Sequence, residues 1–175
     1  MSRMVRENEI SGLRERLFFA RDLLKTLRAE AGSPMGHRLA LRGAVVFHLY
    51  SVLVGMARQS AKSYQVPGYD DLISLAALER AFADSDVHAP EMQLLIQARQ
   101  DRSDPVCWLD LELRAAVGAA GLARRATPPD DTNALALRAE DPYAPLADGD
   151  LERLQEAANR VEELLGLFGT YMDEW

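Results

Sequence analysis

The chain has few of the residues that build metal and redox sites. Its 175 residues include one cysteine, Cys107, and three histidines, which are His37, His48 and His88. A single cysteine excludes an intrachain disulfide and a cysteine pair for zinc. The histidines lie far apart, and the Glu-x-x-His pairs of di-iron bundles do not occur. We therefore expect no metal and no cofactor, and we expect Cys107 to be a structural thiol.

Phosphate-binding glycine motifs and an excess of positive charge are also missing. Neither G-x-x-x-x-G-K-[ST] nor G-x-G-x-x-G occurs. The formal net charge is −7, and the isoelectric point is near 5.0. Nucleic-acid binding depends on the neutralisation of phosphates, so this charge disfavours a general nucleic-acid binder. We expect no nucleic-acid partner.

The apolar runs are short. The longest extends from Ala44 to Ala57 and is interrupted by His48, Ser51 and Gly55. A bilayer crossing needs roughly 20 apolar residues. Residues 1–9 are polar and charged and lack the apolar core of a signal peptide. The sequence therefore predicts a cytoplasmic protein without a membrane span.

Apolar residues at helical spacing are the main positive signal. The first stripe steps by four and three through Leu13, Leu17, Ala20, Leu24 and Leu27. A turn follows, with Gly32 suited to the left-handed C-terminal position, Ser33 to the N-cap and Pro34 to the first turn of the next helix. That second helix is expected over residues 34–64. Its middle, residues 44–54, is apolar nearly all the way round, which is typical of a central helix.

Three shorter helices are expected next. The first two lie near residues 70–83 and 90–101, and they would bury Leu72, Leu75, Leu78 and Phe82, and then Met92, Leu95 and Ile96. The third begins at Asp104-Pro105, an N-cap followed by a first-turn proline. It carries two apolar stripes, which predict contacts on two sides: Val106, Leu109, Leu113, Ala116 and Ala120, and also Trp108, Leu111, Ala115 and Leu122.

The end of the chain is expected to hold a long loop and a sixth helix. Residues 127–149 contain four of the eight prolines and predict an extended, mobile loop. The last helix has a stripe of Leu151, Leu154, Ala158, Val161, Leu165, Phe168 and Met172. Together these patterns predict one all-α domain over residues 1–175, with about six helices in a bundle around the central helix 34–64.

Charge is unevenly spread along the chain. Residues 1–62 carry eleven Lys and Arg against five Asp and Glu, whereas the remainder carries nine against twenty-two. Internal complementarity between packed helices would explain this asymmetry, and so would a docking face on the first helix with Arg14, Arg21 and Arg28. The stripes on the first and last helices also fit a coiled-coil dimer, so a protein partner and self-association are both open.

Two groups on the second helix suggest specific chemistry. Arg42 and His48 resemble the R-x(4–6)-H signature of HEPN ribonucleases, in which such a pair could stabilise and protonate a leaving group. Six residues rotate a regular helix by about 600°, which leaves the pair about 120° apart. Alternatively, His48, Tyr50 and Ser51 could line a small-molecule pocket with Trp108. The third interpretation is ordinary core packing, with His48 hydrogen-bonded to a neighbour.

Five short segments in the same order carry a family likeness. They are RLFFAR at 16–21, FHLY at 47–50, APE at 89–91, PVCWL at 105–109 and MDEW at 172–175. In this order they resemble a family of small helical proteins of unknown function from gamma-proteobacteria, domain-of-unknown-function family 6586. The likeness covers most of the chain outside residues 127–149. It implies a bacterial, cytoplasmic origin and adds no catalytic residue.

The sequence as a whole favours a non-enzymatic interaction or adaptor protein, with no catalytic residue assigned. A helical bundle that binds a small molecule is the second hypothesis, and a HEPN-like ribonuclease is the third.

Overall fold

The computed structural model describes residues 3–118, 146 and 149–173, and this part of the chain contains helices and turns but no strand. The predicted all-α class is confirmed, and so is the number of six α-helices over these residues. They are α1 (Arg3–Ala29), α2 (Met35–Ser63), α3 (Leu75–Asp84), α4 (Pro90–Gln100), α5 (Pro105–Ala116) and α6 (Asp150–Asp173), with a 3-10 helix η1 (Tyr69–Asp71) before α3.

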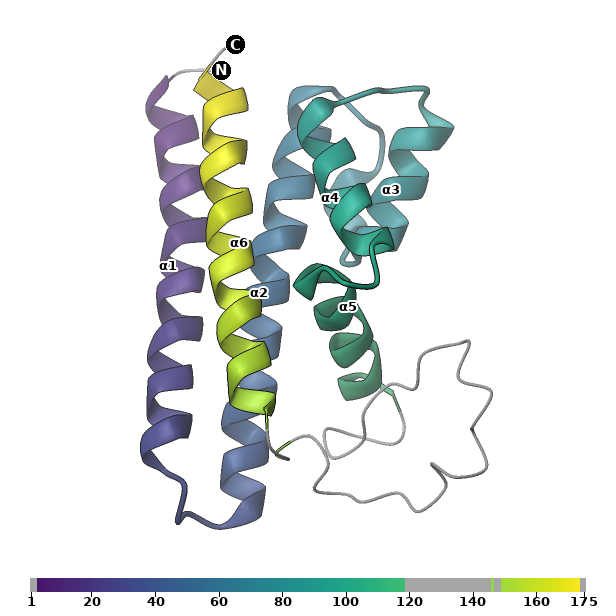
Figure 1. Cartoon of the computed structure of the whole chain (residues 1–175). Coiled ribbons are helices and arrows are strands. Elements are labelled where there is room, and N and C mark those ends of the chain that lie inside the picture. Colours follow the sequence, from purple (N-terminus) through teal and green to yellow (C-terminus); the bar gives the residue numbers. More distant parts are fainter. Residues whose placement is uncertain (1–2, 119–145, 147–148, 174–175) are drawn as a thin grey trace, which may run out of the picture.

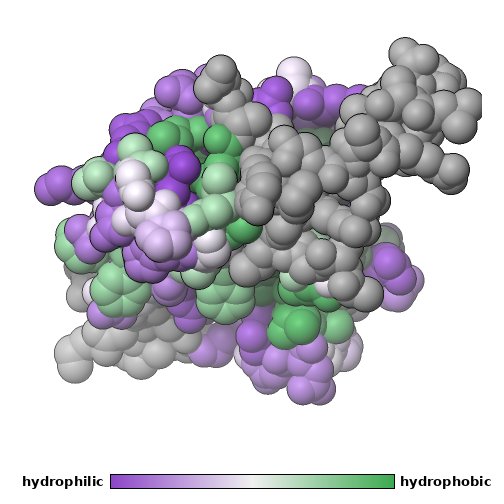
Figure 2. Space-filling model, turned by 90° about the horizontal axis from the view of Figure 1, so that it is seen from below, coloured by the Kyte–Doolittle hydropathy of each residue, from purple (hydrophilic) through white to green (hydrophobic). Residues whose placement is uncertain are grey.

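The three long helices α1, α2 and α6 lie side by side, and the three short ones lie on the other side of α2 (Figure 1). α1 runs antiparallel to both α2 and α6, so the start of α1 and the end of α6 lie at the same end of the bundle. Seen from the opposite end, hydrophilic residues surround separate small apolar areas (Figure 2). The predicted central helix is confirmed, because α2 contacts each of the other five α-helices.

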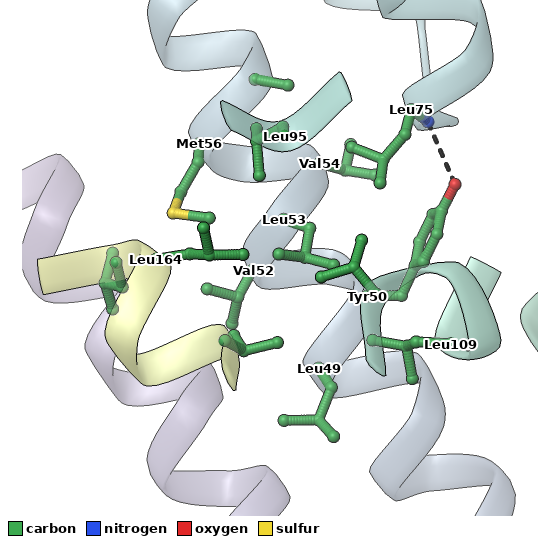
Figure 3. Packing of buried hydrophobic residues seen from close by; sticks show 14 of the residues in the cluster. Leu49, Tyr50, Val52, Leu53, Val54, Met56, Leu75, Leu95, Leu109 and Leu164 are labelled. Atoms are coloured by element: carbon green, nitrogen blue, oxygen red, sulfur yellow. Dashed lines mark hydrogen bonds between the residues drawn. The ribbon is translucent and has the colours of Figure 1, made fainter. Parts of the chain in front are cut away.

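The core forms around the middle of α2 (Figure 3). Leu49, Leu53 and Met56 of α2 have no exposed surface, and Leu109 of α5 and Leu164 of α6 lie around them. Burial of a leucine or methionine side chain contributes roughly 1.5–3 kcal/mol, so these side chains supply much of the stability of the bundle. The stripe predicted for α1 is also confirmed, and that for α6 is confirmed, where the structure describes its side chains, except at its first residue, Leu151, which is only partly buried. The buried residues are Leu13, Leu17, Ala20, Leu24, Leu27, Leu154, Ala158, Val161, Leu165 and Phe168.

By length and composition, α2 is also a candidate membrane span. A central helix of a bundle passes the same test, and half of the relevant window is buried inside the protein. The apolar character of α2 is therefore weak evidence for a membrane span, because the core packing already accounts for it.

The turn between α1 and α2 differs from the prediction. Gly32 does not have a positive φ angle, and Pro34 rather than Ser33 is the N-cap of α2. The Ser33 hydroxyl donates to Glu30 Oε2 at 2.5 Å instead. Ser33 therefore lies one residue before the cap of α2, and its hydroxyl bonds to the carboxylate that follows α1.

The helix predicted over 70–83 is divided in two. After η1, Leu72 is extended, and α3 begins at Leu75 with Ser74 as its N-cap. The Ser74 hydroxyl accepts a hydrogen bond from the backbone N–H of Ala77 at 3.2 Å, which fixes this start.

α5 agrees with its predicted start but not with its predicted second stripe. Asp104 is the N-cap and accepts from the Val106 N–H at 2.8 Å. Trp108 is only half-buried, whereas the acidic residues Asp110 and Glu112 are buried. Ala120, Leu122 and nearly all of the predicted loop 127–149 lie outside the described residues.

Candidate functional site

A buried ion cluster joins α2, α5 and α6. Arg42 of α2 donates from Nε to Asp150 Oδ2 at 2.7 Å and from Nη2 to Asp150 Oδ1 at 2.9 Å. The same Nη2 donates to Glu112 Oε2 at 2.8 Å. All three side chains are at most 5% exposed. Arg42 therefore connects the first residue of α6 to α5 inside the core.

The surroundings of Arg42 stabilise its positive charge. Burial alone would lower the pKa of Arg42, but the hydrogen bonds and charges of Asp150 and Glu112 outweigh burial and raise the pKa above its ordinary value. The guanidinium carbon also lies 5.8 Å from the ring centroid of Trp108, within the range of a cation–π interaction. These contacts are typical of a structural ion cluster.

A second polar cluster surrounds Tyr50. Its hydroxyl donates to Asp110 Oδ1 at 2.8 Å. It also accepts a hydrogen bond from the backbone N–H of Leu75 at 3.0 Å (Figure 3). Asp110 also forms ion pairs with Arg114 and, at 3.7 Å, with Arg99. One hydroxyl thus joins α2 to both α3 and α5.

Replacing Tyr50 by phenylalanine is expected to change how stability depends on pH. Burial, followed by the charge and hydrogen bond of Asp110, raises the pKa of Tyr50 above the ordinary value of 10.0. The unfolded chain loses this proton near pH 10 and the folded protein keeps it, so stability falls as the pH rises above about 10. Urea titrations between about pH 9 and 11 should show a steeper fall in wild type than in Tyr50→Phe, by up to about 1.4 kcal/mol per pH unit. Parallel curves would contradict this.

A surface groove with a volume of about 680 Å³ lies between α1, α2, the turn at residues 69–73 and the end of α5. Along α2 it extends from Phe47 to Lys62. Leu13, Tyr50 and Val54 line its floor and are each at most 8% exposed. The volume lies within the range of roughly 300–1,000 Å³ that is usual for ligand sites.

The floor of the groove requires α1 and α2 to approach closely at Gly55. A Cβ atom at this position would overlap Leu13 Cδ2 and would lie 3.3 Å from Nη1 of Arg16. Arg16 reaches across α2 and donates to the Ser51 carbonyl at 3.2 Å. Because Gly55 has no side chain, α1 lies close enough to α2 for the guanidinium of Arg16 to line the groove.

The groove is cationic at one end and apolar at the other. Arg58 and Lys62 lie one turn apart near the end of α2, and the carboxylate of Asp70 lies 3.7 Å from Arg58. Phe47 and Val117 line the opposite end, where they are 60% and 76% exposed. Among the described side chains that line the groove, three are cations and one is a carboxylate, in a protein whose formal net charge is −7.

A row of rings continues the apolar end of the groove across α2 and α1. The ring centroids of Phe47 and His48 are 5.7 Å apart, those of His48 and Phe19 5.8 Å, and those of Phe19 and Phe18 6.1 Å. All three pairs are edge-to-face, a favourable geometry for aromatic rings. Below, the groove and this row together are called the groove face.

The structure separates the arginines predicted as a docking face. Arg21 donates to Glu162 Oε2 of α6 at 2.6 Å and so pairs α1 with α6 at the surface of the bundle, whereas Arg14 and Arg28 are exposed and do not line the groove. The pairs of Arg21 with Glu162 and of Arg42 with Asp150 each join the basic first part of the chain to the acidic remainder. They favour internal complementarity as the reason for the uneven charge.

The residues predicted to line a small-molecule pocket are also divided. Tyr50 and Ser51 line the groove, but Trp108 lies against Arg42 instead. His48 belongs to the aromatic row and is half-buried. Within the described residues its ring makes no hydrogen bond, which corrects the expectation of a histidine bonded in the core.

Arg42 and His48 point to different surroundings. The guanidinium of Arg42 is bound by Asp150 and Glu112 in the core, whereas the imidazole of His48 lies against two phenylalanine rings near the surface. The two groups do not converge on one point, which a HEPN-like pair would require.

Over the residues that the structure describes, no three His, Cys, Asp or Glu side chains are placed to hold a metal ion. His37 lies 3.0 Å from Glu30 and His88 lies 3.7 Å from Asp86. Cys107 is free and half-buried. These residues belong to three separate parts of the surface and do not form a site.

Sequence reasoning missed the three cations of the groove. Arg58 and Lys62 are four positions apart on a predicted helix, and this spacing places them on one edge. Nothing in the sequence joins Arg16 to that edge, because the contact depends on the packing of α1 against α2 at Gly55.

Comparison with protein-family models, curated proteins and solved structures finds no match for this chain.

Proposed function

We propose that this protein is a non-enzymatic adaptor that binds a partner protein on the groove face. One observation carries the proposal. The described part of the chain exposes six large apolar side chains, and five of them belong to this face. Phe47, Ile73 and Val117 line the groove, and Phe18 and Phe19 belong to the aromatic row, whereas Leu167 lies on α6.

A gathered apolar surface of this kind is typical of interaction sites. Single exposed apolar side chains are normal on a folded protein, but contiguous patches with a polar rim mark binding surfaces. Phe18, Phe47, Ile73 and Val117 are each 60–79% exposed. Aromatic residues are also enriched at the centres of protein interfaces, where their burial contributes most to affinity.

A small-molecule-binding bundle is the second candidate, and the volume of the groove supports it. A small molecule in the groove would still leave Phe18 and Phe19 exposed, since both lie outside it. A protein partner accounts for the whole face, so it is the function that the geometry favours. No described contact gives similar support to a ribonuclease.

Photocrosslinking in cells that naturally make the protein tests the adaptor function. A benzophenone amino acid is placed at Phe47, at Val117 or, as a control, at Leu167, which is 41% exposed on α6. We expect covalent protein adducts from positions 47 and 117 and none from position 167, because only the first two lie on the groove face. Equal adducts at all three positions, or none at positions 47 and 117, would contradict the adaptor function. A small-molecule mass retained in native mass spectrometry would favour the second candidate.

A further inference from the structure

We infer that the partner segment that fills the groove is an amphipathic helix with acidic side chains at one end. This inference rests on the proposed adaptor function and adds the chemistry of the partner. It predicts that the acidic end of the partner helix lies beside Arg58 and Lys62, and that its apolar end lies beside Phe47 and Val117.

The length of the groove suits a helix. The groove follows α2 from Phe47 to Lys62, fifteen positions along the chain. At a rise of 1.5 Å per residue this is about 22 Å, which matches about four turns of a partner helix. A third helix that packs into the furrow between two antiparallel helices uses the same geometry as the bundle itself.

The charges of the groove determine the charge of the occupant. Arg16 donates to a backbone carbonyl, which leaves its positive charge without a carboxylate in that contact. Arg58 donates to the backbone carbonyl of Asp70 and lies 3.7 Å from the Asp70 carboxylate, which is 75% exposed, and Lys62 also makes an interaction of its own. The described lining residues therefore carry three positive charges and one negative charge, and carboxylates on the occupant complement this difference.

The apolar end of the groove excludes a simple anion as the full occupant. Phe47 and Val117 at this end, and Ile73 in the turn at residues 69–73, are covered only by a segment that carries apolar side chains of its own. On a helix, apolar residues at i, i+4, i+7 and i+11 form such a stripe. A strand has no open sheet edge to join here, because the described part of the chain contains no strand.

Two designed helical peptides of about 16 residues test the inference with the purified protein. Both carry four leucines at i, i+4, i+7 and i+11, and they differ only in Glu or Lys at the polar positions. Fluorescence anisotropy at low salt should show at least about tenfold tighter binding of the Glu peptide. The net charge of −7 would by itself favour the Lys peptide, so a preference for Glu reports the groove and not the whole protein.

Two charge-reversed variants show which residues cause the preference for the Glu peptide. The variant R58E/K62E should lose or invert it, whereas K25E/R28E makes the same change in net charge on α1 outside the groove and should keep it. Circular dichroism checks that each variant is folded, and Lys62→Gln gives a milder test if R58E/K62E unfolds. A Lys-peptide preference, equal binding, or a Glu preference that survives R58E/K62E would overturn the inference.

Two other occupants are distinguished in the same assay. If hexadecanoate binds at one molecule per chain and neither peptide does, the groove takes a small amphiphile and the inference is wrong. If the protein self-associates and Ile73→Glu abolishes this, a second copy is the occupant and the inference is again wrong. Crosslinks from positions 47 and 117 without any charge preference would leave the adaptor function standing and overturn only the acidic helix.

Discussion

Replacing Arg42 by methionine is expected to lower the free energy of unfolding by about 3–5 kcal/mol. The variant keeps a long side chain but leaves Asp150 and Glu112 buried without the cation that binds both. Desolvated carboxylates are costly, and removing one partner from a buried ion cluster is more harmful than removing the whole cluster. Urea denaturation followed by circular dichroism measures the loss.

Two further variants identify the cause of that loss. Arg42→Lys keeps the charge but not the planar guanidinium that bonds to two carboxylates, so we expect a smaller destabilisation than with methionine. Arg28→Met removes a charge from the exposed end of α1 and should change stability by less than about 0.5 kcal/mol. If Arg42→Met were as mild as Arg28→Met, the cluster would have no structural role.

Replacing Leu53 by alanine should lower the free energy of unfolding by about 2–5 kcal/mol. Leu53 lies in the middle of α2 with no exposed surface, and several helices surround it (Figure 3). The smaller side chain loses its own burial and also leaves a cavity that long, packed helices cannot close completely. The same urea titration measures the effect.

The control for Leu53 is the same substitution at an exposed leucine. Leu167→Ala on α6 removes a side chain that is 41% exposed and should have a much smaller effect. Leu53 and Arg42 are eleven positions apart on one helix, about 16 Å, so the effects of the two substitutions should add within about 0.5 kcal/mol. A strongly non-additive pair would show that the ion cluster and the core around Leu53 form one cooperative unit.

The helices could be predicted because apolar spacing decides which side of a helix is buried. The stripe from Leu13 to Leu27 and the all-round apolar middle of α2 gave the right elements and the right central helix. The turns were harder to predict. Ser33 and Ser74 are both serines beside a helix start, yet only Ser74 is a cap, since Pro34 occupies the cap position of α2 and Ser33 lies one residue before it.

The buried charges could not be predicted, since their partners are distant in sequence. Glu112 and Asp150 lie 70 and 108 positions from Arg42, and each resembles an ordinary surface acid. The groove was not predicted either, because one of its exposed residues lies in a stretch that was expected to be buried. Phe47 belongs to an apolar stretch that predicts burial on every side, but it lines the groove and is 60% exposed.

The position of α6 in the chain has a consequence for synthesis. α6 contacts α1, α2, α4 and α5, yet it follows all of them in the sequence. At a synthesis rate of about 5–20 residues per second, α2 is complete on the order of ten seconds before α6, which covers one of its apolar sides, has been synthesised. Arg42 likewise has no Asp150 during that interval. The nascent chain therefore exposes both an apolar surface and an incomplete ion cluster, and this interval is when a chaperone would bind and when aggregation is most probable.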